Sequence, residues 1–582
     1  MGYKIPIYIL KNSPFGVEVN ITFTVQLIFN NYNMNKLSKS FILFLLIPLY
    51  MSLQSCHDLK NKADLIIYNA KIYSPDSLAK DINCIAVSKG KIIGIGTDAE
   101  IRSRYWSPEN INAAGAFVYA GFTDAHSHFT GFALGLRYAD LTQAHSFDEV
   151  LEILKGYRKL HPDGWIVGRG WDQNNWPQKV FPDNKLLNTI FPDIPIVLTR
   201  VDGHAVLASD AAIKASGITF PGKVGEAKLQ NGTFTGIFLE SLADKLRNSI
   251  PLPSATEITA LLETATKLCH QAGLTSVTDA GLNKSEVLML DSLQKAGKIT
   301  LRIDAWLNPN EENFEYFMKD SVYHTPFLKV GAIKMYADGA LGSRGACLLE
   351  PYLDEPHNKG IITISPNELS TICKRAYDHG FQMVTHAIGD SAIRMVLHTY
   401  SKFLKPDDDR RWRIEHAQVV NENDFELFAK FHIIPSIQAT HATSDMDWAR
   451  HRIGYERLKN AYAYNRLLKQ NGWLPNGTDF PIEDISPLKT FYASVSRKNA
   501  DGEPEEGFMM ENALSRPDAL KSITTWAAKA AFCENERGSI ELGKDADFTI
   551  LNTDIMKSPE IKILMSKVLY TIVDGKTVYK AK

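Results

Sequence analysis

Short apolar segments alternate with stretches of helical pattern along most of this chain, and this alternation limits its fold more than any other feature. The clearest helical stretch runs from Thr256 to Ala272, and Gly273 follows it as a C-terminal cap. Parallel strands need a long crossover connection, which a helix usually supplies. Eight strand candidates lie at 116–125, 275–280, 300–307, 329–336, 381–386, 412–416, 433–438 and 473–479. Eight such units predict an α/β fold, a (β/α)8 TIM barrel, whose functional residues lie at the C-terminal ends of the strands.

The interval between the first two strand candidates is too long for a single helix. It contains strand candidates of its own, at Trp165–Gly168 and Ile194–Leu198. We therefore expect a barrel that spans 116–534 and carries an insertion at about 129–250, after the first barrel strand. The insertion is expected to cover the end of the barrel where the site lies.

Both ends of the chain contain short β-like segments separated by turn residues. These segments lie at Leu65–Tyr68, Lys71–Tyr73, Cys84–Val87, Lys91–Ile95, Ala546–Leu551, Val568–Val573 and Lys576–Tyr579. Because the pattern is the same at both ends, we expect them to pair into one composite β domain. This small β-sandwich would be formed by residues 57–115 and 535–582.

The beginning of the chain resembles an export signal. A basic segment at Met34–Ser40 precedes an apolar run, Phe41–Leu53, that is too short for a comfortable transmembrane helix. The run ends in a Leu-Gln-Ser-Cys sequence at Cys56, which resembles the bacterial lipobox, where the cysteine carries the lipid. We expect a lipoprotein signal peptide at 34–56. Translation is expected to begin at Met34, so that residues 1–33 are an extension upstream of the true start. The protein would then be exported to the bacterial cell envelope and held at a membrane by its lipid alone. The alternative is an ordinary secretory signal in which the cysteine falls by coincidence.

The charge balance and the cysteine pattern argue against two classes of site. The 582 residues include 64 Lys and Arg and 66 Asp and Glu, a net charge of −2, whereas a nucleic-acid-binding protein normally carries a basic surface. The cysteines are widely scattered, at positions 56, 84, 269, 347, 373 and 533. Such spacing supports neither a disulfide framework nor a cysteine-based zinc site.

Two histidines, His126 and His128, follow the first strand candidate in the segment Gly121–His128. Residues two apart on an extended chain point to the same side. Both imidazoles therefore face one way, as two ligands of one divalent metal ion would. Among 16 histidines such a pair also arises by chance, so two surface histidines at a strand end remain an alternative.

Further candidate ligands end the later strands. Lys334, His386, His416 and Asp479 end the fourth, fifth, sixth and eighth strand candidates. Each has an ordinary structural interpretation, such as a paired core lysine or a capped polar residue. Together with the histidine pair they occupy the ends of five strands of one predicted barrel. This coincidence favours a functional site at that end.

Seven segments carry a more specific pattern: Asp124–His128, Arg200–His204, Lys334–Arg344, Thr385–Asp390, Ile414–Gln418, Gly477–Pro481 and Leu542–Asp547. In these segments the chain resembles the amidohydrolase superfamily, closest to its amidohydro-3 type, the N-substituted formamide deformylase-like metal-dependent hydrolases. The similarity runs from about Ala63 to Lys582. One departure is Ala120, where the family commonly has proline; it alters a turn and no ligand.

The resemblance implies a divalent metal site, with zinc as the expected ion. The implied ligands are His126 and His128 for one ion, His386 and His416 for a second, and Asp479 at the water. Lys334 would bridge two ions as a carbamylated lysine, because an unmodified ammonium has no lone pair for a cation. The alternative is a one-metal enzyme in which Lys334 is uncharged or pairs with Asp338.

The resemblance also implies a reaction, the hydrolysis of a C–N bond other than a peptide bond in a small-molecule amide. Metal-activated hydroxide would attack the carbonyl carbon, and Asp479 would take the water proton and pass it to the leaving nitrogen. The side chains that could line the substrate pocket are His204, Trp171, Asp172 and Tyr336, and the alternative for each of them is packing in the core or in a loop.

Two other functions stay open at this point. The same scaffold could carry a cyclic amidohydrolase or a deaminase. The chain could also be a catalytically silent binding lipoprotein, although a binding protein has no need for Asp479. The acyl and amine groups of the substrate, the number of metal ions and a homo-oligomeric state stay open as well.

Overall fold

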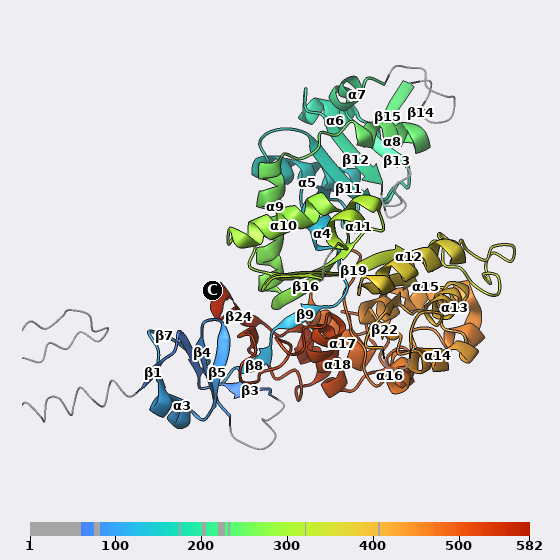
Figure 1. Cartoon of the computed structure of the whole chain (residues 1–582). Coiled ribbons are helices and arrows are strands. Elements are labelled where there is room, and N and C mark those ends of the chain that lie inside the picture. Colours follow the sequence, from blue (N-terminus) through green and yellow to red (C-terminus); the bar gives the residue numbers. More distant parts are fainter. Residues whose placement is uncertain are drawn as a thin grey trace, which may run out of the picture. The chain divides into compact units, whose positions relative to one another are not determined.

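The computed structural model describes residues 60–74, 82–173, 176–200, 205–218, 227–230, 233–319, 322–405 and 408–582. The chain divides into two compact units, and the larger one consists of Ala63–Ile101 and Ser107–Lys582. Within the smaller unit, β1 (Asn61–Lys62) pairs in parallel with β6 (Tyr105–Trp106). The sheets and the candidate site described next belong to the larger unit (Figure 1).

Several predicted features lie outside the described residues. These are the extension at 1–33, the signal peptide at 34–56 with its Cys56, and the pocket candidate His204. In the described ranges, no helix is both long and apolar enough to cross a membrane.

Seven parallel strands form a curved central sheet (Figure 1). In hydrogen-bonded order they are β22 (Ile434–Ser436), β21 (Arg413–His416), β20 (Gln382–Ala387), β19 (Leu328–Tyr336), β17 (Arg302–Leu307), β16 (Leu274–Leu282) and β9 (Phe122–Asp124). A short strand, β18 (Tyr323–His324), pairs antiparallel with β19. Strands β16 and β17 are buried along nearly their whole length, as in parallel sheets covered on both faces. The α/β class and six of the eight strand positions are therefore as predicted.

The first strand candidate, 116–125, forms two strands in two different sheets. Its first half is β8 (Phe117–Ala120), which pairs with strands from the ends of the chain, and only its second half, β9, joins the central sheet. Gly121 separates the halves, and a Cβ placed there would lie 2.2 Å from Oγ1 of Thr275. The chain changes sheets at a point of close backbone approach, which only glycine allows.

The last strand candidate, 473–479, is not a regular strand in the described structure. A single parallel bridge joins Asn476 to Ile437, just beyond β22. At the other edge, the Asp479 N–H donates to the carbonyl of His126 over 2.8 Å. The segment thus hydrogen-bonds near both edge strands without forming a ladder, and a closed eight-stranded barrel stays a prediction.

Helices follow the strands and pack against them. The predicted helix at 256–272 is α9 (Ala255–Gln271), whose N-terminus is capped by the Ser254 hydroxyl; Gly273 follows it with a φ of +91°. The other helices around the sheet are α10 (Lys284–Lys295), α11 (Glu311–Phe317), α12 (Pro366–Asp378), α13 (Asp390–Tyr400), α14 (Phe425–Lys430), α15 (Ala439–Leu458), α16 (Tyr464–Asn471), α17 (Pro487–Ser496), α18 (Arg516–Ser522), α19 (Thr525–Ala530) and α20 (Glu560–Leu564).

A mixed sheet of six strands lies in the sequence between β9 and β16. Its order is β10 (Ala139–Asp140), β11 (Ile166–Trp171), β12 (Ile196–Arg200), β13 (Ala205–Ala208), β15 (Thr233–Leu239) and β14 (Ala227–Gln230). The helices described in this segment are α4 (Phe129–Gly135), α5 (Phe147–Leu160), α6 (Lys185–Ile190), α7 (Asp210–Ser216) and α8 (Glu240–Asn248). The two strand candidates expected inside the insertion are β11 and β12, while the boundaries of the insertion and its covering role stay predictions.

The two ends of the chain contribute strands to common structure. One sheet has the order β5 (Lys91–Gly96), β4 (Cys84–Ser88), β2 (Leu65–Tyr68) and β7 (Glu109–Asn112). The other has β25 (Lys576–Lys580), β24 (Val568–Val573), β23 (Phe548–Leu551), β8 and β3 (Lys71–Ile72). Side chains of both sheets, such as Ile85 and Ile550, belong to one buried hydrophobic cluster. The pairing of the two ends is thus observed, whereas a β-sandwich domain with the expected boundaries stays a prediction.

Candidate metal centre

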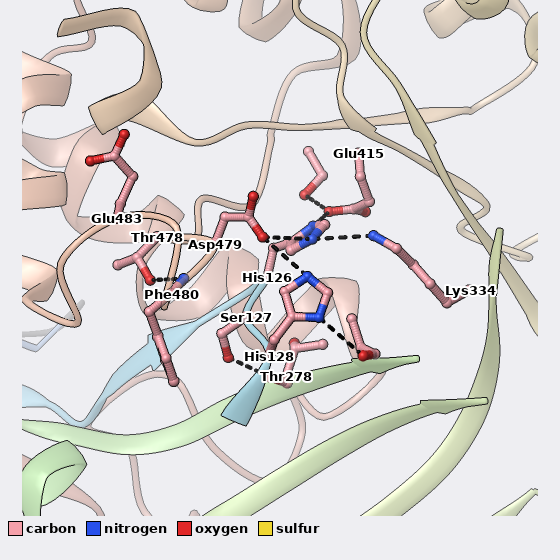
Figure 2. A network of polar contacts seen from close by, with 12 residues as sticks. His126, Ser127, His128, Thr278, Lys334, Glu415, Thr478, Asp479, Phe480 and Glu483 are labelled. Carbon is pink, nitrogen blue, oxygen red and sulfur yellow. Dashed lines mark hydrogen bonds and ion pairs between the residues drawn. The ribbon is translucent and has the colours of Figure 1, made fainter. Parts of the chain in front are cut away.

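His126 and His128 follow β9 and turn their Nε2 atoms toward Asp479 (Figure 2). The distances from Nε2 to Oδ1 of Asp479 are 3.4 Å for His126 and 3.3 Å for His128. Their Nδ1 atoms lie 2.5 Å from Oε2 of Glu415 and 3.2 Å from the carbonyl oxygen of Ala280, respectively. An ionised carboxylate and a carbonyl can only accept, so Nδ1 donates in both rings. Oδ1 of Asp479 has no hydrogen-bond partner, so neither Nε2 donates to it, and in the neutral rings the lone pair is on Nε2. This is the tautomer that a metal ligand needs.

Glu415 is a buried carboxylate that the sequence interpretation missed. Nε of Arg413 donates to its Oε1 over 2.7 Å, and the Ser436 hydroxyl donates to its Oε2 over 2.7 Å. Burial alone would raise the pKa of Glu415, but Arg413 and His126 lower it to about 2, so the group is ionised at neutral pH. The next residue, His416, has a φ of +71° and leaves the strand conformation, so two consecutive side chains reach the same cluster.

Lys334 lies on β19 with its side chain fully buried. Its Nζ is 3.2 Å from Nε2 of His126, which again places a lone pair on that atom. Burial lowers the pKa of Lys334 to about 8, which increases the fraction of neutral amine. Asp338, the alternative partner, instead accepts the N–H groups of Ile388 and Gly389 over 3.0 and 2.8 Å.

His386 and His416 lie beside each other, with ring centroids 4.5 Å apart. Nε2 of His386 and Nδ1 of His416 are buried and have no hydrogen-bond partner within the described structure. Burial lowers the pKa of His386 to about 3, with Lys334 adding to the effect, and holds the pKa of His416 well below its usual range. Both rings are therefore neutral at pH 7 and can offer a lone pair to a cation.

Asp479 is the residue on which the cluster converges, and its backbone has a φ of +62°. Its Oδ1 is buried without a hydrogen-bond donor, while its Oδ2 lies 3.3 Å from Nε2 of His441. Burial alone would raise the pKa of Asp479, but the surrounding histidines, of which His441 donates to Oδ2, hold it well below its usual range. The carboxylate is therefore ionised and has one oxygen free for a further partner.

His441 on α15 and Glu483 were not expected from the sequence. Nδ1 of His441 lies 3.1 Å from Oε1 of Glu483, and its ring stacks on His416 with centroids 5.7 Å apart. Burial alone would lower the pKa of His441, but Asp479 and Glu483 raise it to about 10. A signal was present, because His441 lies only a few residues beyond the seventh strand candidate, 433–438.

The pocket candidates lie in different places. Tyr336 is 44% exposed, and its ring centroid lies 5.6 Å from that of His386, beside the cluster. Trp171 is buried in the core of the mixed sheet, where its indole N–H donates to the Leu198 carbonyl over 2.8 Å. Asp172 forms an ion pair with Arg200 at 2.5 Å. The contacts described for Trp171 and Asp172 do not bring either residue to the cluster, and their expected role in substrate binding stays a prediction.

The donor set fits a divalent cation. Among the cluster's predicted ligands, three buried atoms have no hydrogen-bond partner in the described structure: Nε2 of His386, Nδ1 of His416 and Oδ1 of Asp479. Two groups of three residues have ligand atoms close enough to share an ion, His126 with His128 and Asp479, and His416 with His441 and Asp479. Imidazole nitrogens with carboxylate oxygens are typical ligands of zinc and similar metals.

Comparisons with known proteins agree with this chemistry. The model of the Amidohydrolase family matches residues 109–579. The chain is 30% identical over 508 residues to the putative amidohydrolase YtcJ of Bacillus subtilis (strain 168), covering 85% of this chain and 96% of that protein. It is 25% identical over 544 residues to the N-substituted formamide deformylase of Arthrobacter pascens, covering 88% and 97%. Among solved structures, an uncharacterized metal-dependent hydrolase from Pyrococcus horikoshii OT3 matches with a TM-score of 0.72 and 27% identity, covering 85% of this chain and 99% of that one. The chain therefore belongs to the amidohydrolase family.

Proposed function

We propose that this amidohydrolase cleaves a C–N bond other than a peptide bond, in a small amide such as an N-substituted formamide. One observation carries the proposal. Nε2 of His126 and Nε2 of His128 both lie within 3.4 Å of Oδ1 of Asp479, and that oxygen is buried without a hydrogen-bond partner. A cation would satisfy these three atoms together. The name of the Arthrobacter relative supports the class of bond.

Zinc is the cation that we propose, because the donors are imidazoles and carboxylates. The proposed ligands are His126, His128 and Asp479 for one ion, and His386 and His416 for a second. Lys334, buried between the histidines and without a carboxylate partner among the described residues, would bridge the ions as a carbamate. When bound, the metal would polarise the substrate carbonyl and lower the pKa of a water molecule.

Asp479 is the proposed acid and base. Its free Oδ1 would accept a proton from the attacking water and deliver it to the leaving nitrogen, since an amine leaves poorly as an anion. Tyr336, exposed beside His386, would contact the substrate.

Three further expectations, about the fold and the location of the protein, belong to the same proposal. The hydrogen bonds that Asn476 and Asp479 form near both edge strands support a closed (β/α)8 barrel. The shared core of the two terminal sheets supports a β-sandwich domain. Export and lipid attachment at Cys56 rest on the sequence alone.

The test is a substrate screen with the purified full-length protein, combined with metal analysis. The panel contains linear formamides and acetamides, cyclic amides and amino-substituted heterocycles. We expect turnover of linear amides that a chelator abolishes and zinc restores. Turnover of cyclic amides or amino-heterocycles alone would assign the alternative chemistry, and a metal-bound protein that binds amides without turnover would be a binding protein.

A further inference from the structure

His441 has a carboxylate on each side of its ring. Its Nε2 lies 3.3 Å from Oδ2 of Asp479, and its Nδ1 lies 3.1 Å from Oε1 of Glu483. Only 12% of the side chain is exposed. Because carboxylate oxygens only accept hydrogen bonds, both ring nitrogens carry hydrogens in this arrangement. A ring with two N–H groups has no lone pair to offer a cation.

This arrangement separates His441 from the other imidazoles of the cluster. In His126 and His128 one nitrogen donates away from the centre, while the other lies near Oδ1 of Asp479 without forming a hydrogen bond to it. The ligand atoms of His441, His416 and Asp479 lie close enough together to share an ion. Both ring nitrogens of His441, however, already donate to carboxylate oxygens. His441 is therefore placed to orient the carboxylate of Asp479, a proposed metal ligand, rather than to bind the metal itself.

The two oxygens of Asp479 have different surroundings. Oδ1 faces His126 and His128 and has no donor, whereas Oδ2 receives His441. The backbone N–H of Asp479 donates to the His126 carbonyl, and this bond fixes the backbone. It does not fix the rotation of the side chain. His441 supplies the contact that fixes it, since a hydrogen bond to Oδ2 determines where Oδ1 points.

Glu483 extends the same arrangement to a third residue. It follows Asp479 by four positions, so one loop places carboxylates on both sides of the His441 ring. Its Oε1 also accepts from the Ser444 hydroxyl over 2.6 Å. Ser444 lies three residues after His441 on α15, on the same face of the helix. His441 and Ser444 of α15 therefore both donate to Glu483, and Glu483 in turn orients the His441 ring.

We propose that His441 is a positioning residue for Asp479, and that Glu483 orients His441 for this task. The inference rests on the proposed function, in which Asp479 moves the proton. Without His441 the carboxylate can rotate, and Oδ1 leaves the point on which His126 and His128 converge. Misplacement of a reacting group by about 1 Å can cost about 100-fold in rate.

The first experiment compares His441→Ala with His441→Gln, with His451→Ala as the matched control because His451 is exposed on the same helix. We expect His441→Ala to lower kcat by about 10–100-fold with KM changed by less than about threefold. His441→Gln should recover most of the loss, because its side-chain amide can donate to Oδ2. Metal content of both His441 variants should be no lower than that of Asp479→Asn, because His441 acts on the metal only through Asp479. A metal ion lost in His441→Ala but kept in Asp479→Asn would make His441 a ligand and overturn the proposal, as would an unchanged kcat.

A double variant tests whether His441 acts through Asp479. In an Asp479→Asn background, His441→Ala should lower the remaining kcat by less than about threefold, since residues that act as a unit are not additive. If the double variant lost kcat by the product of the two single-variant losses, the proposal would be overturned.

A crystal structure of the His441→Ala variant gives a readout that does not depend on turnover. We expect the Asp479 carboxylate to rotate, so that Oδ1 leaves the Nε2 atoms of His126 and His128. An unchanged carboxylate would overturn the positioning role. If the wild-type protein hydrolysed no amide, the proposed function would fail, while metal content and the orientation of Asp479 would still decide the role of His441.

Discussion

Oε2 of Glu415 lies 2.5 Å from Nδ1 of His126, although the two residues come from β21 and the end of β9, which are not neighbours in the sheet. The contact therefore joins two strands that four other strands separate in the sheet. It is fixed from the other side by Arg413, which donates to both oxygens of Glu415. In this way a carboxylate that does not reach the centre itself determines which nitrogen of His126 faces it.

The first prediction concerns this contact. Glu415→Gln removes the charge that orients His126, so we expect zinc affinity to fall by about 10–100-fold. Competition with a chromophoric chelator measures the affinity. Glu426→Gln, an exposed change on α14, is the control. Equal affinities for Glu415→Gln and the wild type would show that the orientation of His126 does not depend on Glu415.

The second prediction concerns Lys334. Lys334→Ala should lose most activity and at least one metal ion, because two close cations need an anionic bridge. Small carboxylic acids should restore part of the rate by filling the vacated space. Metal analysis and an acetate titration measure the two effects, and Lys374→Ala, at an exposed lysine on α12, is the control. A Lys334→Ala protein with wild-type metal content and rate would rule out the carbamate.

Part of the site could be predicted from the sequence, because the functional residues of a barrel lie at the C-terminal ends of its strands. His126, His386 and Asp479 follow apolar segments, and parallel strands bring such ends to one side of a sheet. Of the residues assigned in this way, His126, His128, His416 and Asp479 have ligand atoms close enough to share an ion with their neighbours, and His386 lies beside His416. Their roles as ligands stay a prediction.

Other features could not be predicted, because they depend on contacts between distant segments. Glu415 precedes His416 directly, and strict strand alternation would send its side chain to the opposite face; the positive φ of His416 changes that. His441 lies just past the seventh strand candidate, but its side chain projects from α15, and only the contacts with Asp479 and Glu483 show that it belongs to the cluster. The two-sheet division of 116–125 depends on the close approach of Gly121 to Thr275.

The third prediction concerns acid stability and His270. Burial lowers the pKa of His270 to about 4, and its ring contacts the Leu274 carbonyl and the Thr300 hydroxyl. The unfolded chain binds this proton near pH 6.5, so the stabilisation is present above that pH and is lost as the pH falls toward 4. We expect Tm to fall less steeply between pH 7 and pH 4 in His270→Gln, with the exposed His398→Gln as control. Parallel curves for His270→Gln and the wild type would show that His270 does not contribute to acid unfolding.

The fourth prediction concerns the start of the mature chain. Cys56→Ser removes the residue proposed to carry the lipid, so the variant should appear as an unprocessed or unanchored precursor. Membrane fractionation with N-terminal sequencing measures both properties. Normal membrane retention with an unchanged N-terminus would contradict lipid attachment at Cys56.

The most direct test of the proposed hydrolase is the rate of Asp479→Asn on a series of amides with increasingly acidic leaving amines. Asparagine keeps the size of the side chain and a carbonyl acceptor, so Tm should stay close to that of the wild type. It cannot carry a proton at neutral pH, and kcat on an unactivated amide should fall by at least about 100-fold. The loss should shrink as the leaving amine becomes more acidic, because such amines need less protonation. Near-native turnover of an unactivated amide by Asp479→Asn would remove Asp479 from the reaction and contradict the proposed function of the cluster.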